Sequence, residues 1–296
     1  MWEHADTFGH GGPWLYDTLT RVPLIVKDIA GRGQPGRVAH AVQSYDLMPT
    51  LIELAGLEIS DPDLNARSLQ PWVELPSSAA LERPCVSENV KQHVTSVVQG
   101  DWKLIVNHPP ERRVTTRLFS LNEAPNEQRD IKARHPARAA TLGRAMADWI
   151  VQNRRGLFLA YAPGPGAGSM ELTVRSDSPM RRARAWFGGT GVTQDSRLLQ
   201  TVTGEHARLV FVEIDRPEDA ALTVAAARRG ESESWIETTV EPDAIAQYES
   251  DDIERLFASE EPTVRVFRGA PPVLKEETKQ MNAQRLEALR ALGYIQ

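Results

Sequence analysis

The chain has 296 residues, with 34 basic and 40 acidic side chains and a formal net charge of −6. This balance lacks the excess of Lys and Arg that neutralises a phosphate backbone, so nucleic acid is not an expected partner. The single cysteine, Cys85, excludes an intrachain disulfide framework and a cysteine-based zinc site. No run approaches the ~20 apolar residues that cross a bilayer, so no transmembrane segment is expected. The start of the chain carries no signal-peptide pattern, and the compartment stays open.

The N-terminal third is expected to alternate loops with short elements. Residues 1–30 are rich in Gly and His and lead into Arg21-Val22-Pro23-Leu24-Ile25-Val26-Lys27, a β-branched apolar run that predicts a buried strand. Residues 42–56 carry apolar side chains at helical intervals, with a kink or a fresh start at Pro49 and a stop at Gly56.

The middle of the chain predicts a hairpin, a further strand and a helix. Residues 93–98 and 102–106 are expected to be the two arms of the hairpin, with Gly100-Asp101 as the turn. Residues 118–121 are expected to form another short strand. Residues 136–153 carry an apolar stripe at helical spacing.

Composition shifts at the Pro-Gly-rich run that ends at Gly168, which favours a linker over residues 157–168. Beyond it, short strand-like segments predict a small antiparallel sandwich: 171–175, 183–187, 208–214 and 221–227. The expected organisation is an α/β unit over residues 1–156, a β-rich domain over 169–273 and a C-terminal helix over 274–296.

Several short blocks occur in an order typical of one family. They are Phe8-Gly9-His10-Gly11, Leu15-Tyr16-Asp17, Arg21 to Val26, Tyr45-Asp46-Leu47-Met48-Pro49-Thr50-Leu51, Ala66-Arg67-Ser68-Leu69, Gly100-Asp101-Trp102-Lys103-Leu104-Ile105 and the run from Leu118 to Glu127. In this order the blocks resemble the C-terminal portion of an arylsulfatase-like sulfatase of the alkaline phosphatase superfamily. The resemblance covers about half of the chain, and residues 157–273 match no family.

The resemblance implies an α/β fold, here a truncated alkaline-phosphatase-like core with a small antiparallel C-terminal subdomain. It also implies a sulfuric ester hydrolase, or a related phosphonate or phosphodiester hydrolase, that acts on a sulfate-ester small molecule or glycan. The full-length parent is expected to use a formylglycine nucleophile and a divalent metal of the calcium type. Neither the nucleophile motif Cys/Ser-X-Pro-X-Arg nor the acidic metal ligands occur in this sequence, since Cys85 precedes Val86-Ser87-Glu88. We therefore expect those parts to lie upstream and the chain alone to be inactive.

Two histidines are the candidate site residues. The resemblance places His10 where the family has a Lys or His that contacts the sulfate or the leaving-group oxygen, and an imidazole with a pKa near ~6.5 can donate a proton there. His4, in a Glu3-His4 pair, is expected to line the same pocket and bind substrate. The plainer alternatives are a histidine in a flexible Gly-rich loop and a surface histidine. Tyr16 is expected to pack in the core, and Asp46 is expected to cap a helix.

Two other readings stay open. The chain could be a pseudoenzyme with a structural role, or its β-rich region could bind a glycan or a partner through Trp186, Trp235 and Tyr248. Core packing is the plainer role, above all for Trp186. If the neighbours of the strand over residues 21–27 lie upstream, the chain alone should be poorly soluble or partly disordered before about residue 60.

Overall fold

The computed structural model describes most of the chain between Trp14 and Gly269. The described residues are 14–27, 31, 33–57, 66–76, 83–109, 114–123, 127–154, 156–180, 182–187, 189–195, 197–203, 209–215, 221–231, 233–249 and 251–269. The expected C-terminal helix over residues 274–296 lies outside them.

Short helices make up the N-terminal layer. They are α1 (Asp17–Thr20), η1 (Ser44–Asp46), α2 (Leu47–Leu54) and α3 (Gln70–Glu74). Pro49 lies in the first turn of α2, where its missing N–H would have had no helical partner, so the prediction of a helix start is confirmed. Gly56 follows the helix with φ +71°, a conformation that glycine adopts at low cost.

The expected buried strand over residues 21–27 is wrong for the chain as the structure shows it. These residues form no helix or strand, and Ile25 and Val22 are 91% and 74% exposed. A strand needs a neighbour that accepts and donates its backbone hydrogen bonds. No strand of the described chain lies beside this run, so its apolar side chains stay in solvent.

A four-stranded antiparallel sheet, here sheet A, follows. It has the order β1 (Cys85–Asn89), β2 (Val94–Gln99), β3 (Trp102–Asn107) and β4 (Thr115–Ser120), with η2 (Val90–Gln92) between the first two strands. The predicted hairpin is confirmed as β2 and β3, which turn at Gly100 with φ +56°. The predicted helix is α4 (Pro136–Asn153).

Two five-stranded sheets form a sandwich. The first, sheet B, has the order β13 (Ala246–Gln247), β14 (Thr263–Arg268), β5 (Leu157–Ala162), β10 (Val210–Asp215) and β7 (Arg182–Phe187). The second, sheet C, has the order β12 (Ser234–Val240), β11 (Leu222–Arg228), β6 (Met170–Ser176), β9 (Leu198–Thr203) and β8 (Gly189–Asp195). η3 (Pro242–Ala244) and α5 (Asp252–Phe257) connect the last strands. Among the described strands, all pairs are antiparallel except β13 with β14.

The expected linker over residues 157–168 needs correction in its first half. Residues 157–162 form β5, the middle strand of sheet B, and every residue of β5 is buried. The run is apolar throughout because both of its faces are covered. Only the Pro-Gly segment after it is a turn, with Gly164 and Gly166 at φ +78° and +74°.

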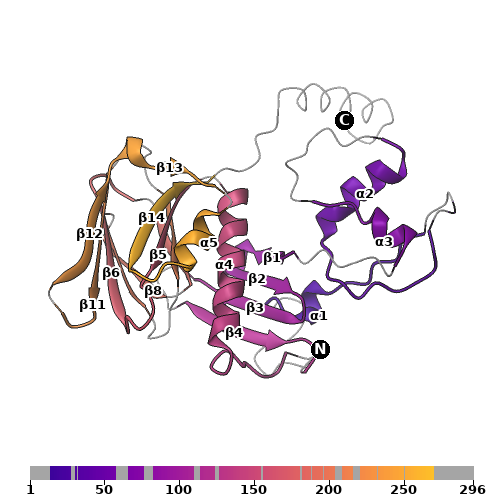
Figure 1. Cartoon of the computed structure of the whole chain (residues 1–296), viewed down its shortest axis with the longest axis horizontal. Helices are drawn as coiled ribbons and strands as arrows, with labels where there is room; N and C mark the ends of the chain where they lie inside the picture. Colours follow the sequence, from indigo (N-terminus) through magenta and orange to yellow (C-terminus); the bar gives the residue numbers. More distant parts are fainter. Residues whose placement is uncertain are drawn as a thin grey trace.

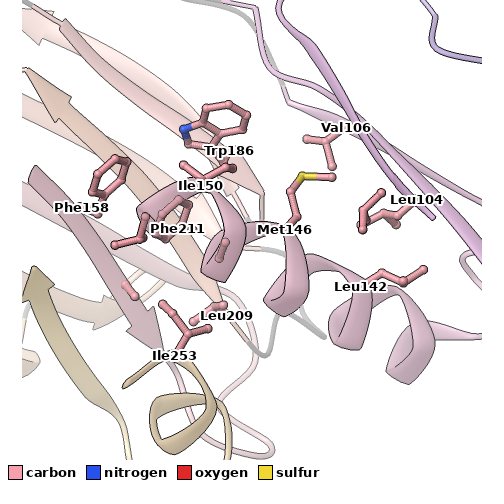
Figure 2. Packing of buried hydrophobic residues seen from close by; sticks show 14 of the residues in the cluster. Leu104, Val106, Leu142, Met146, Ile150, Phe158, Trp186, Leu209, Phe211 and Ile253 are labelled. Atoms are coloured by element: carbon pink, nitrogen blue, oxygen red, sulfur yellow. The ribbon is translucent and has the colours of Figure 1, made fainter. Parts of the chain in front are cut away.

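Helix α4 joins the sheets into one core. Figure 2 shows Leu142 and Met146 of α4 beside Leu104 and Val106 of sheet A, and Ile150 beside Phe158 and Phe211 of sheet B. The far side of sheet B packs on sheet C through a second cluster that includes Leu159, Leu172 and Val224. In Figure 1, α4 and α5 lie on one side of the sandwich and β11 and β12 on the other. Among the described helices, none is long and apolar enough to cross a membrane.

Candidate functional site: a buried ion network beneath the N-terminal segment

His4 and His10 lie outside the described residues, so the structure neither brings them together nor separates them. The described chain starts at Trp14, only four positions after His10. The segment that starts there is held on sheet A by apolar, aromatic and ionic contacts. These contacts define where the His-bearing stretch joins the fold.

The apolar contacts come first. Leu15 and Tyr16 are buried against Val94, Ile105 and Phe119 of sheet A. The Tyr16 ring meets Phe119 edge-on, with centroids 5.9 Å apart. This confirms the packing role predicted for Tyr16.

Arg117 of β4 adds a polar contact at the same place. One guanidinium N–H donates to the Tyr16 hydroxyl at 2.6 Å, and the guanidinium carbon lies 4.0 Å from the centre of the Trp14 ring. Arginine over an indole face is favourable because the ring carries negative potential there.

An ion network lies beneath α1. The Lys103 side chain is fully buried, and its ammonium Nζ lies 2.7 Å from Asp17 Oδ1 and 2.9 Å from Glu127 Oε1. Nζ also donates to the Thr20 hydroxyl at 3.2 Å, and the backbone N–H of Asp17 donates to Glu127 Oε2. The ammonium thus donates hydrogen bonds to Asp17 and Thr20 and forms an ion pair with Glu127.

The charges in this network do not cancel, since one ammonium faces two carboxylates. Burial raises the pKa of the Glu127 carboxyl, and this effect outweighs the opposing attraction of Lys103 and the hydrogen bond from the Asp17 backbone. Without Lys103, the buried Glu127 would lie beside Asp17, whose one other cationic neighbour among the described ion pairs is the exposed Arg21 at 3.9 Å. The contacts that hold residues 14–20 on sheet A, here called the anchor, therefore depend most on Lys103.

The three charged residues come from three separate sulfatase-like blocks of the sequence. Asp17 ends Leu-Tyr-Asp, Lys103 lies in Gly-Asp-Trp-Lys-Leu-Ile, and Glu127 ends the block that starts at Leu118. Sequence reasoning did not single out Lys103 or Glu127. The available signal was one lysine inside the apolar run Trp102 to Val106, where a charge is stable only with buried partners.

Asp46 forms a second polar junction between blocks. Its carboxylate is fully buried, accepts the Gln43 N–H at 2.8 Å in a capping box and accepts the Arg67 N–H at 3.0 Å. It also pairs with Arg83. Asp46 is the N-cap residue of α2 but makes no side-chain cap hydrogen bond there; its carboxylate instead caps the 3-10 helix η1 and ties the Ala66-to-Leu69 block to the start of α2.

Thr50, in the same block as Asp46, makes a parallel link. Its hydroxyl donates to the Asp46 carbonyl at 2.6 Å and accepts the Leu69 N–H at 2.8 Å. Five of the blocks are thereby joined in two buried polar junctions.

The described residues do not fit a metal ion. They contain no group of three or more His, Cys, Asp or Glu side chains that could hold one. The carboxylates of Asp17 and Glu127 already face Lys103.

Cys85 has the features of a packed residue. It starts β1, is 8% exposed and donates its thiol hydrogen to the Ala41 carbonyl at 3.4 Å. Burial raises its pKa to about 11, so the reactive thiolate is scarce at neutral pH. This agrees with the absence of a nucleophile motif around it.

The three aromatic residues of the β-rich region differ in exposure. Trp186 is fully buried and donates its indole N–H to Glu213 at 3.0 Å, which confirms the core role predicted for it. Tyr248 is also buried, with its hydroxyl bound to Asp148. Trp235 is 40% exposed.

No protein-family model matches the sequence, and no curated protein matches it. Solved structures do show a partial likeness. One is BT4656 in complex with its substrate D-glucosamine-2-N,6-O-disulfate, at 20% identity and a TM-score of 0.30, covering 35% of this chain and 23% of that one. Another is Ps i-CgsB, with and without k-i-k-neocarrahexaose, at 22% identity and a TM-score of 0.33, covering 38% of this chain and 25% of that one. The chain thus spans about a quarter of the length of these proteins, and a likeness this limited carries no argument about activity.

Proposed function

We propose that this chain is the C-terminal portion of a sulfuric ester hydrolase whose nucleophile and metal ligands belong to other parts of the polypeptide. The substrate class is a sulfate ester of a small molecule or a glycan. In this proposal the described residues form the scaffold against which the catalytic part is assembled.

The observation that carries the proposal is the convergence of the sulfatase-like blocks. Short matches that arose by chance would have no reason to meet in space. Here Asp17, Lys103 and Glu127 make one buried ion network, while Asp46 and Thr50 join two further blocks. Buried charges are costly unless they are paired, so a shared network of this kind supports a common structural origin for the blocks.

The anchor also suggests how the chain contributes to catalysis. By fixing Trp14 to Thr20 on sheet A, it restricts where the preceding residues can run. We assign His10 the role of donating a proton or a hydrogen bond to the leaving-group oxygen, and His4 a place in the substrate pocket. Restricting a catalytic side chain lowers the entropic cost of reaching the reactive geometry.

An uncovered apolar surface supports assembly with a further layer. All of the exposed large hydrophobic side chains among the described residues lie between Leu19 and Leu75, except Val90 and Trp235. This part of the sequence thus carries most of the exposed large apolar side chains of the described residues. We assign this surface, with the extended run over residues 21–27, to contact with the catalytic portion.

The test starts from the reading frame that contains residues 1–296. It should encode Cys/Ser-X-Pro-X-Arg and acidic metal ligands ahead of this chain, and its full product should hydrolyse 4-methylumbelliferyl sulfate faster than the corresponding phosphate diester or phosphonate. The chain alone should be inactive. A frame without these motifs, or a full product inactive on all three esters, would refute the proposal.

His10 can be tested in the same product. His10→Gln should lower kcat by ~10²- to 10⁴-fold, the usual contribution of general acid catalysis, while leaving folding intact. His10→Lys, which restores a cationic donor, should recover part of the loss. Equal rates for the wild type and His10→Gln would remove His10 from the mechanism.

A further inference from the structure

Trp235 stands out from the other large aromatic side chains of the sandwich. Trp186 and Tyr248 are buried, whereas Trp235 is 40% exposed near the start of β12. It lies at an irregularity in the β11–β12 pairing, where the register shifts between Ala226 and Ala227. At this bulge two consecutive residues, Ser234 and Trp235, are both exposed, and Trp235 shares the exposed side of β12 with Glu237 and Thr239.

The exposed indole is held in place. Its N–H donates to Glu231 Oε2 at 3.2 Å, and the Arg228 guanidinium carbon lies 4.6 Å from the centre of the Trp235 ring. Arg228 and Glu231 also pair with each other at 3.6 Å. A ring with its orientation already restricted loses little conformational entropy when a ligand stacks on it.

The charges around the ring are balanced. The ring itself is flanked by one charge of each sign, Arg228 and Glu231, and Glu237 farther along β12 adds one exposed carboxylate. This charge pattern matches an uncharged ligand that has an apolar face and hydroxyl groups. A pyranose ring has both, since its C–H groups can stack on an indole and its hydroxyls can bond to carboxylates and hydroxyls.

The adjoining sheet surface suits the same ligand. The hydroxyls of Thr223 and Thr239 contact each other at 3.2 Å on the exposed side of β11 and β12, and Glu237 on the same strand is exposed. Ala225 pairs with Glu237 across the two strands, and its small side chain does not project far from the sheet. The described helices α4 and α5 lie on the other side of the sandwich, so they do not cover sheet C (Figure 1).

We propose that the β11–β12 hairpin binds polysaccharide by stacking a pyranose ring on Trp235. The contact is stacking rather than charge attraction, so binding to a neutral polysaccharide should change little with salt. The proposal is independent of the sulfatase assignment, because it concerns a region outside the sulfatase-like blocks.

Retention of the full chain in affinity electrophoresis through gels containing xylan, mixed-linkage β-glucan or galactomannan tests the proposal, with heparin and dextran sulfate as anionic comparisons. At least one neutral polysaccharide should retard the wild type, equally at 50 and 500 mM NaCl. Trp235→Ala should weaken retention at least tenfold, whereas Val90→Ala, which removes another exposed apolar side chain, should not. Trp235→Tyr, which keeps an aromatic face, should retain part of the binding.

The opposite results are equally specific. No retention on any neutral polysaccharide, or unchanged retention of Trp235→Ala, overturns the proposal. Retention on heparin alone that disappears at 500 mM NaCl also overturns it, since that pattern indicates charge attraction. Circular dichroism of each variant distinguishes loss of the Trp235 ring from loss of folding. If Trp235→Ala does not fold, the retention of Trp235→Tyr tests the proposal instead.

Discussion

Lys103 and its two carboxylate partners show how a charge can be part of a protein interior. The ammonium occupies a position of zero exposure in the middle of a four-stranded sheet, with Asp17 and Glu127 within 3 Å. Breaking a buried network by removing one partner is far more costly than replacing all partners together. The network is therefore most sensitive at Lys103, its buried positive charge, since the other cation beside Asp17 is the exposed Arg21.

Lys103→Met keeps much of the side-chain volume but leaves the buried Glu127 without its counter-ion and Asp17 with only the exposed Arg21 at 3.9 Å. We expect a loss of ~3 to 5 kcal/mol in the free energy of unfolding, measured by urea denaturation at pH 7. Lys91→Met, which changes an exposed lysine, is the control and should stay within ~0.5 kcal/mol of the wild type. Equal stability of Lys103→Met and the control would contradict the role given to the network.

Asp148 provides a prediction about pH. Burial raises the pKa of this carboxyl, outweighing the hydrogen bonds from Tyr248 and Gln152. A raised folded-state pKa means that the folded chain holds the proton to a higher pH than the unfolded chain. This contribution to stability is present at low pH and is lost as pH rises from the unfolded to the folded pKa.

Asp148→Asn removes that titration while keeping an acceptor oxygen for Tyr248. The free energy of unfolding of Asp148→Asn relative to the wild type should therefore increase from pH 4 upward through the folded pKa. Urea titrations at several pH values measure the difference. A difference that stays flat or decreases over that interval would argue against the effect of burial on Asp148.

At the scale of elements, α4 holds the molecule together because its apolar stripe is wide. Leu142 and Met146 pack against sheet A, whereas Ile150 packs against sheet B (Figure 2). A helix placed between two sheets needs a broad buried face. Residues at positions i, i+4 and i+8 follow one line along α4, and the buried Gly143, Ala147 and Val151 beside them widen it.

Met146→Ala should cost ~2 to 5 kcal/mol, because Met146 is fully buried and its surroundings come from different elements that cannot all move inward. Arg144→Ala on the same helix removes a surface contact with Glu254 at 3.4 Å and should cost no more than ~1 kcal/mol. Thermal and urea unfolding of both variants measure the difference. Similar losses for the two would place α4 outside the core.

The whole molecule is organised by a core that crosses the expected domain boundary. One cluster contains Val97 and Leu104 from sheet A as well as Phe158 and Phe211 from sheet B, with α4 between them. Arg154, at the end of α4, extends the link by pairing with Glu88 of β1 at 2.5 Å and with Glu213 of β10 at 3.6 Å. The sandwich and sheet A therefore bury each other's apolar surface.

A fragment of residues 169–296 should not fold as a unit. It lacks β5, the common neighbour of β10 and β14, and it exposes the surface that α4 covers. We expect broad, poorly dispersed amide resonances and no cooperative thermal transition, whereas the full chain should unfold cooperatively. A sharp transition in the fragment would show that the sandwich is an independent domain.

The sequence by itself predicted the elements whose signals are local. The hairpin of β2 and β3 was recognisable from its Gly-Asp turn, α4 from its apolar spacing, and β6, β7, β10 and β11 from short alternating runs between turn residues. The order of the sulfatase-like blocks is also a property of the sequence alone. Turn chemistry and periodicity depend on a few neighbouring residues, so they can be recognised in the sequence without the tertiary structure.

The tertiary structure decided the features that depend on distant partners. β5 was mistaken for a linker because an apolar run beside a Pro-Gly segment has no periodicity to mark it as a strand covered on both faces. The exposure of residues 21–27 followed from the lack of a neighbouring strand in the described chain. Lys103 acquires its role from Asp17, 86 positions away. A buried charge is stable only when such a partner is brought to it, and that depends on how the whole chain packs.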